Sequence, residues 1–139
     1  MKIERFEDIK AWQEARVLVK MVYAVVDSDR HFGSDYKFRE QIQGAAVSTM
    51  SNIGEGFSRR TTKEFAQFLF IAKGSVAEVQ SQLYVALDQG YVNQEKFNEM
   101  YSKSDEVARL LSGFIQYLLK AERQNQKTQR TGQEWSKGG

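Results

Sequence analysis

The chain has 139 residues, of which 41% are hydrophobic and 27% are charged, and it contains no cysteine and no proline. This composition is typical of one globular domain, and the missing cysteines exclude disulfides, thiolate chemistry and cysteine-bound zinc. The net charge of +2 is uneven, because residues 120–139 hold five basic and two acidic residues, whereas residues 1–119 hold 15 and 16.

Four stretches have apolar residues at the three- and four-residue spacing of a helix that packs on one side. They cover about residues 7–26, 35–55, 61–90 and 93–120. Proline costs about 3 kcal/mol inside a helix, so its absence suits helices of this length. Short connections between such helices predict an all-α chain folded as an antiparallel, up-down-up-down four-helix bundle.

We place the bundle in residues 1–120 and expect a separate tail after it. Residues 121–139 are polar and basic and have no apolar stripe. A segment of this composition buries too little apolar surface to offset the entropy of ordering. We therefore expect the tail to be frayed or disordered.

Residues at the helix ends carry turn and capping signals. Thr61 and Glu64 have the spacing of a capping box, which predicts the start of the third helix. Gly90 ends that helix, and Gly56 predicts a left-handed cap at the end of the second helix.

The third helical stretch is apolar on more than one side. One stripe, which includes Leu69 and Val76, fits the interior of a bundle. Three further apolar side chains fall outside that stripe: Phe68, Phe70 and Ile71. Other copies of the chain can cover a second apolar side, so these three residues predict an oligomer interface. Stacking of the rings on nucleic-acid bases is the alternative.

A polar pair lies within the apolar pattern of the second helix. Asn52 and Glu55 are three residues apart and share one side of a helix, close to the predicted core. A buried carboxylate that has no partner destabilises a protein by several kcal/mol. We therefore expect the pair to bond neighbouring backbone or side chains, such as Lys73 or Ser75, and to fix the second helix against the third. An acid group in a binding pocket is the alternative.

A basic cluster follows the second helix. Arg59 and Arg60 precede Lys63 at the start of the third helix, where guanidinium groups and free backbone N–H groups favour a phosphate. Lys37 and Arg39 lie about 30 Å away at the other end of the second helix, so they join this site only if another subunit brings them there. These five residues form our candidate nucleic-acid site. For a single subunit we favour a solvated loop instead.

Five short motifs occur in an order that is characteristic of a known family. They are Phe6-Glu7-Asp8-Ile9-Lys10-Ala11-Trp12-Gln13-Glu14-Ala15, Gln41-Ile42-Gln43-Gly44-Ala45-Ala46-Val47-Ser48, Asn52-Ile53-Gly54-Glu55-Gly56, Glu64-Phe65 with Phe68-Leu69, and Ile71-Ala72-Lys73-Gly74-Ser75 with Glu78. Over residues 6–119 the chain resembles the four-helix-bundle proteins encoded in intervening sequences of bacterial 23S rRNA genes. That family usually has alanine at Gly54 and an arginine near Gly44, and the missing arginine weakens a nucleic-acid role carried over from it.

The resemblance implies a left-handed four-helix bundle, often a ring-shaped homopentamer, without known catalysis. The accessory protein of diversity-generating retroelements is similar in fold and assembly, which implies nucleic acid or a reverse transcriptase as a partner. We therefore expect a non-enzymatic homo-oligomer, with a pentamer favoured, that serves as a scaffold or adaptor for RNA, DNA or a nucleic-acid enzyme. A protein–protein interaction module with no nucleic-acid role is the alternative.

Residue types and spacings give little support for catalysis. The one histidine, His31, belongs to no Glu-x-x-His pair, so we expect no metal, no cofactor and no catalytic residue. An enzyme would need Glu55 or Glu78 in a pocket that solvent reaches. No apolar run approaches the roughly 20 residues that span a bilayer, and the first residues lack a signal-peptide core, so we expect a cytoplasmic protein.

Overall fold

The computed structural model describes residues 2–138, with side chains up to residue 129. Its helices are η1 (Phe6–Asp8), α1 (Lys10–Ser28), α2 (Arg30–Ser34), α3 (Tyr36–Phe57), α4 (Thr62–Asp88) and α5 (Gln94–Gly138). The described residues contain no strand, which confirms the prediction of an all-α chain for that range. No helix within it is long and apolar enough to cross a membrane.

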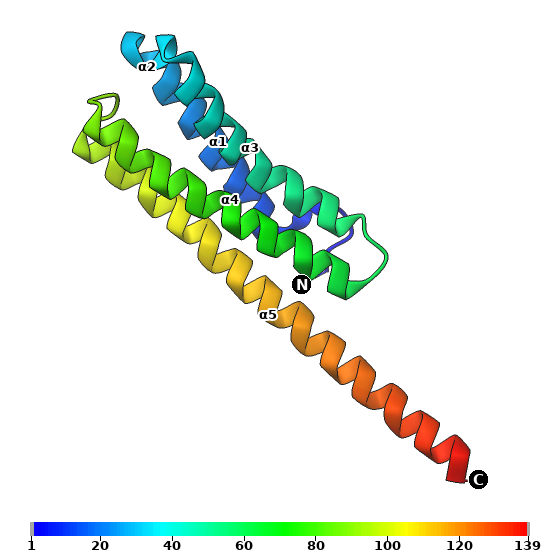
Figure 1. Cartoon of the computed structure of the whole chain (residues 1–139). Coiled ribbons are helices and arrows are strands. Elements are labelled where there is room, and N and C mark those ends of the chain that lie inside the picture. The colour runs from blue at the N-terminus through cyan, green and yellow to red at the C-terminus, as the bar shows by residue number, and fades with distance from the viewer. Residues whose placement is uncertain (1, 139) are drawn as a thin grey trace.

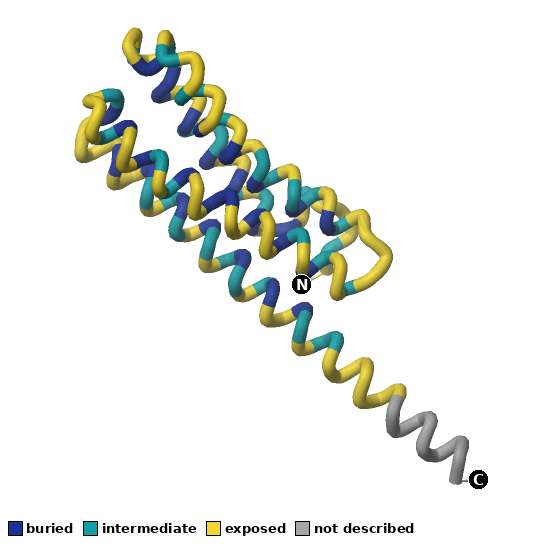
Figure 2. The backbone as a smooth tube through the Cα atoms, in the orientation of Figure 1, coloured by how far each residue is buried: buried dark blue, intermediate teal, exposed yellow. Residues whose placement is uncertain are grey.

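The four long helices, α1, α3, α4 and α5, lie alongside one another (Figure 1). α3 packs against α4, α4 packs against α5, and α1 packs against both α3 and α5, so the contacts close into a ring. Apolar side chains from all four helices meet inside this ring, and Figure 2 shows the buried residues there. Two core clusters fill it, one around Phe32 and Leu83 beside α2, the other around Leu69 and Leu111 beside η1.

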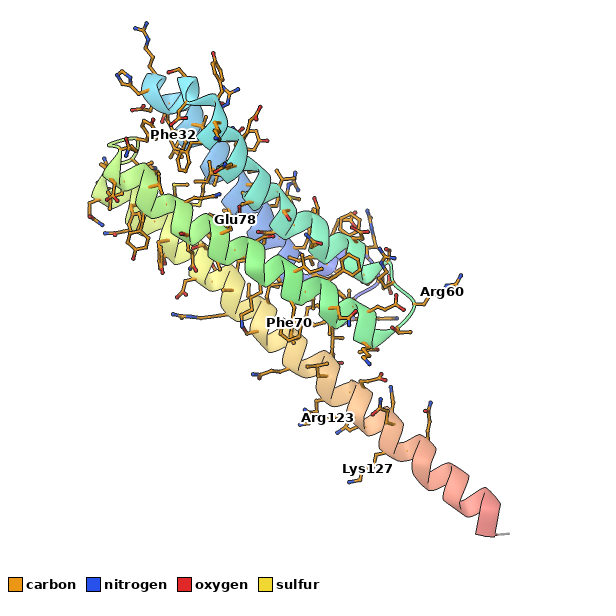
Figure 3. The ribbon with its side chains drawn as sticks, in the orientation of Figure 1. Phe32, Arg60, Phe70, Glu78, Arg123 and Lys127 are labelled. Carbon is orange, nitrogen blue, oxygen red and sulfur yellow. The ribbon has the colours of Figure 1, made fainter. Side chains whose placement is uncertain are left out.

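The connection between α1 and α3 is itself partly helical, because Phe32 is buried there. Asp29 caps α2 by accepting a hydrogen bond from Phe32 N at 2.8 Å. The Phe32 ring stacks on Phe38 and Tyr91, with ring centres 5.7 and 4.9 Å away. The Tyr91 hydroxyl donates to Asp35 Oδ2 at 2.7 Å. This cluster closes one end of the molecule, which we call the α2 end (Figure 3).

Two of the predicted helix-end signals agree with the structure. At the start of α4, Thr61 Oγ1 accepts a hydrogen bond from Glu64 N at 3.1 Å. After the end of α4, Gly90 has a left-handed φ of 75°, a conformation that glycine adopts without steric cost.

The predicted cap at Gly56 is wrong, because this residue lies inside α3 and has no positive φ. Its missing side chain serves packing instead. A Cβ atom at Gly56 would stand 2.7 Å from Phe68 Cβ and 2.9 Å from Phe65 Cδ1. α4 therefore approaches α3 at Gly56 more closely than a larger residue would allow.

α5 continues past Lys120, where the apolar pattern predicted the end of the fourth helix. Beyond that point it projects from the other helices (Figure 1), and residues 123–129 are exposed. Residues 120–129 contain no glycine or proline and consist mostly of good helix formers, which suits a helix that lacks packing partners. The disorder expected for residues 121–139 stays a prediction, and side chains from residue 130 onward lie outside the described part.

An ion-pair cluster ties α1 to α5. Lys103 Nζ donates to Glu14 Oε2 at 2.6 Å and to Glu106 Oε2 at 2.7 Å, and Lys10 Nζ lies 2.9 Å from Glu14 Oε1. The hydrogen bond from Lys103 lowers the pKa of Glu14 below its ordinary value. The hydrogen bonds to Glu106 and Glu14 raise the pKa of Lys103. Both shifts favour the charged forms, so the cluster stabilises the fold across the neutral pH range.

Gly56→Ala is expected to lower the free energy of unfolding by about 1–3 kcal/mol, because the added methyl group overpacks the α3–α4 contact. Gly113→Ala is the matched control. Gly113 lies inside α5 with no atom within 4 Å of its Cβ position, so alanine there should raise stability by about 0.5–1 kcal/mol. Chemical denaturation measures both variants, and equal stability of the two would contradict the packing role of Gly56.

Because the pKa of Glu14 is lowered, its contribution is complete above the ordinary value of 4.5 and is lost as pH falls through the lowered pKa. Glu14→Gln should reduce the unfolding free energy by about 1 kcal/mol at pH 7, and this difference should shrink toward pH 3. Asp105→Asn, which breaks an exposed pair with Arg109, should change stability by less than about 0.5 kcal/mol. A Glu14→Gln effect of equal size at both pH values would rule out the linkage.

Candidate interaction surfaces

A line of amide and hydroxyl groups crosses from α3 to α4. Asn52 Nδ2 donates to the Ser48 carbonyl at 2.8 Å and lies 3.0 Å from Ser48 Oγ. The Ser48 and Ser75 hydroxyls are 3.0 Å apart, and Ser75 is buried. The structure thus brings Asn52 and Ser75 together through Ser48. The sequence pattern did not indicate Ser48 as the link, although it lies one helical turn before Asn52.

Glu55 and Lys73 do not belong to this line. Glu55 is exposed, and its Oε1 accepts a hydrogen bond from Arg59 Nη2 at 2.7 Å, while Lys73 is exposed on α4. Three residues advance a helix by about 300°, so Glu55 lies about 60° to one side of Asn52. That side faces solvent, and Glu55 bonds Arg59 there and neither of the two partners named for the pair.

Three of the predicted phosphate-binding residues lie in or next to the α3–α4 connection, in different environments. The Arg59 guanidinium lies 4.5 Å from the centre of the Phe68 ring and pairs with Glu55. Arg60 points away from the helices (Figure 3). Both Arg60 and Lys63 are exposed, and neither has an ion-pair partner among the described side chains. Arg60 in the connection and Lys63 in the first turn of α4 therefore remain open to solvent.

Lys37 and Arg39 lie at the other end of α3, as expected. The 22 residues of α3 span about 33 Å. Arg39 Nη1 donates to the Gly33 carbonyl at 2.8 Å, and the guanidinium lies 4.9 Å from the centre of the Tyr36 ring. Arg39 therefore supports the end of α2, and within one chain it lies far from Arg60.

One side of α4 is both exposed and apolar. We call its four large side chains the α4 outer face: Phe70, Ile71 and Tyr84, each 52% exposed, and Val85, 43% exposed. Exposed residues lie between them: the small Gly74, Ala77 and Ser81, and the acidic Glu78 between Ile71 and Val85. Phe68 is not part of this face, because it is half-buried between Gly56 and Arg59. Two of the three predicted interface residues thus share one exposed side with Tyr84 and Val85.

A cavity of about 530 Å³ opens at the end of the molecule opposite α2. Lys10 is the one charged residue of its lining, which is otherwise formed by apolar and aromatic side chains such as Ile9, Phe65, Phe114 and Leu118. These residues come from segments far apart in the chain, so no local motif could have indicated the cavity.

The acidic residues considered for an enzyme do not line this cavity. Glu55 pairs with Arg59 on the surface, and Glu78 is exposed and accepts a hydrogen bond from Gln82 Nε2 at 3.3 Å (Figure 3). Nor does the described part of the chain place three metal-binding side chains together. The surfaces that stand out are therefore the α4 outer face and the exposed cations.

Comparisons with known proteins indicate a family and a fold but no activity. The family model of the 23S rRNA-intervening sequence protein matches residues 7–113. A crystal structure of a protein with unknown function from the S23 ribosomal protein family, from Bacteroides thetaiotaomicron, is similar with a TM-score of 0.64 and 19% identity. The similarity covers 76% of this chain and 97% of that one, and at this identity it shows the fold alone. No curated protein matches the chain.

Proposed function

Because this chain belongs to the 23S rRNA-intervening sequence protein family, we propose that it is a non-enzymatic, homo-oligomeric scaffold or adaptor for RNA, DNA or a nucleic-acid enzyme. The family name states no activity, and the similar crystal structure is of a protein with unknown function. The observation that carries the proposal is the α4 outer face, which is apolar and uncovered in a single chain. A reverse transcriptase as the enzyme rests on the family resemblance alone.

The fold proposed for each subunit is an antiparallel, up-down-up-down, left-handed four-helix bundle. The ring of contacts among α1, α3, α4 and α5 supports it. So do the connections, because four residues lie between α3 and α4 and five between α4 and α5. Connections this short return the chain alongside the preceding helix. The left-handed twist rests on the resemblance.

Other copies of the same chain are the partners we propose to pack on the α4 outer face. Monomeric proteins rarely expose large contiguous apolar patches, and burying such surface contributes roughly 25 cal/mol per Å². The small residues Gly74, Ala77 and Ser81 separate the large ones, so a neighbouring helix can approach the α4 backbone between Phe70 and Tyr84. A ring of five subunits is the arrangement that the resemblance favours.

Arg60 and Lys63 are the residues we propose for contact with phosphate, since both are exposed cations at the α3–α4 connection. Each subunit of a ring repeats this weak site, which raises the avidity for a long polyanion. Lys37 and Arg39 contribute only where neighbouring subunits bring the two ends of α3 together.

The double variant Phe70→Glu with Ile71→Lys should change the assembly into monomers at micromolar concentration, because it puts charges into the proposed interface. Both residues are half exposed in the single chain, so circular dichroism should show an unchanged helix content. Tyr36→Ser, which removes a 64% exposed ring at the α2 end, is the control and should leave the mass unchanged. Light scattering measures the masses, and an unaltered mass of the double variant would place the interface elsewhere.

Binding of a 20-nucleotide RNA or DNA should weaken steeply as salt rises, because released counterions drive it. Arg60→Ala should reduce the slope of log K against log salt by about 1. Arg59→Ala should reduce it less, because Arg59 already pairs with Glu55 and packs on Phe68. Fluorescence anisotropy between 50 and 200 mM salt measures the slopes. If the wild type does not bind at 50 mM, the nucleic-acid part of the proposal is lost.

A protein-only interaction module is the second candidate function. The end cavity favours it, because an apolar lining accepts an apolar side chain better than a phosphate. A partner protein that stays bound to the chain after nuclease treatment and in high salt would support this function. Loss of the partner under either treatment would support the nucleic-acid function.

A further inference from the structure

The projecting part of α5 carries a row of basic side chains. Lys120, Arg123 and Lys127 follow one another at spacings of three and four residues. At about 100° per residue, these spacings put them within about 60° of one another around the helix, and Figure 3 shows Arg123 and Lys127 on the same side of α5. Residues 123–129 are all exposed (Figure 2). Arg130 continues the spacing in the sequence, although its side chain lies outside the described part.

The rest of this projecting surface is polar and nearly neutral. Glu122 is the one acidic residue among residues 120–129, and the others are alanine, glutamine, asparagine and threonine. No apolar stripe accompanies the basic row, so this part of α5 lacks the seam through which a second helix packs in a coiled coil. A protein partner would find few apolar anchors here, whereas a phosphate backbone needs only cations and hydrogen-bond donors.

The two ends of the molecule carry net charges of opposite sign. At the end from which α5 projects, residues 2–10, 55–64 and 116–129 hold nine basic and six acidic residues. At the α2 end, residues 27–40 and 88–99 hold four basic and seven acidic residues. The net charges are therefore +3 and −3. The resulting field attracts a polyanion to the projecting helix and repels it from the opposite end.

Two cations of the row differ in their pairing from a basic residue further up the same helix. Further up α5, Arg109 pairs with Asp105 at 2.7 Å. Lys120 and Arg123, in contrast, have no ion-pair partner among the side chains that the structure describes. Cations without a partner need no existing bond to break before they meet a phosphate.

We propose that the projecting part of α5 is a cationic arm that binds the phosphate backbone of a nucleic acid along Lys120, Arg123 and Lys127. The proposal rests on the proposed nucleic-acid function and gives it a second surface, separate from the α3–α4 connection. Seven residues of helix cover about 10 Å, a length over which a duplex carries about six phosphate charges. Contact with the backbone does not read bases, so the arm supplies affinity and position without sequence specificity.

The arm variant replaces Lys120, Arg123 and Lys127 with glutamine, which removes three charges and keeps a good helix former. We expect at least about tenfold weaker binding at 50 mM salt and a salt slope reduced by about 2–3. The probes are a labelled 20-nucleotide oligo(U) RNA and a labelled 20-base-pair DNA duplex, measured by anisotropy on the full chain. Lys120→Arg with Lys127→Arg keeps the charges and should bind like the wild type.

The matched control replaces Lys20, Arg30 and Lys96 with glutamine, so it loses the same charge from exposed positions away from the arm. It should bind within about twofold of the wild type. If the arm variant and this control bind equally well, the proposed role of the arm would be overturned, while the proposed function would stand. A wild type that binds neither probe at 50 mM would overturn both. If the arm variant loses binding to only one of the two probes, the result would support the cationic arm and show which kind of nucleic acid it binds.

Discussion

The close contact between α3 and α4 determines what this chain presents to its surroundings. Gly56 lets α4 lie against the last turn of α3, and the hydrogen bond between Ser48 and Ser75 joins the same helices about two turns earlier. These two contacts set the rotation of α4 about its axis. Phe70 and Ile71 consequently lie on its exposed side, so a helix with many buried residues also carries four exposed large apolar side chains.

Helical spacing predicted the features that depend on local periodicity. It predicted the four long helices and the exposed positions of Phe70 and Ile71. It could not predict the environments of Glu55 and Gly56, because these depend on where a neighbouring helix passes the end of α3. Helical spacing also placed the end of the fourth helix at Lys120, too early in the chain. A stripe of apolar residues shows where packing stops, and it does not show where the helical backbone stops.

The two kinds of surface lie in different parts of the molecule. The α4 outer face runs along the side of a long helix, whereas Arg60, Lys63 and the basic row of α5 lie at the end from which α5 projects. An assembly built through α4 therefore leaves the cations accessible and repeats them in every subunit. Repetition turns weak phosphate contacts into useful avidity. The acidic α2 end repels a polyanion, so it directs a nucleic acid toward the opposite end of the molecule.

The mass of the wild-type protein in solution tests the central claim most directly, because the α4 outer face is either covered by other copies or exposed to water. Sedimentation equilibrium at micromolar concentration, with and without RNA, measures that mass. We expect a multiple of the 16.0 kDa chain without RNA, and five copies, about 80 kDa, for the favoured pentamer. A mass of 16.0 kDa, with Phe70 and Ile71 exposed to water on a single chain, would contradict it.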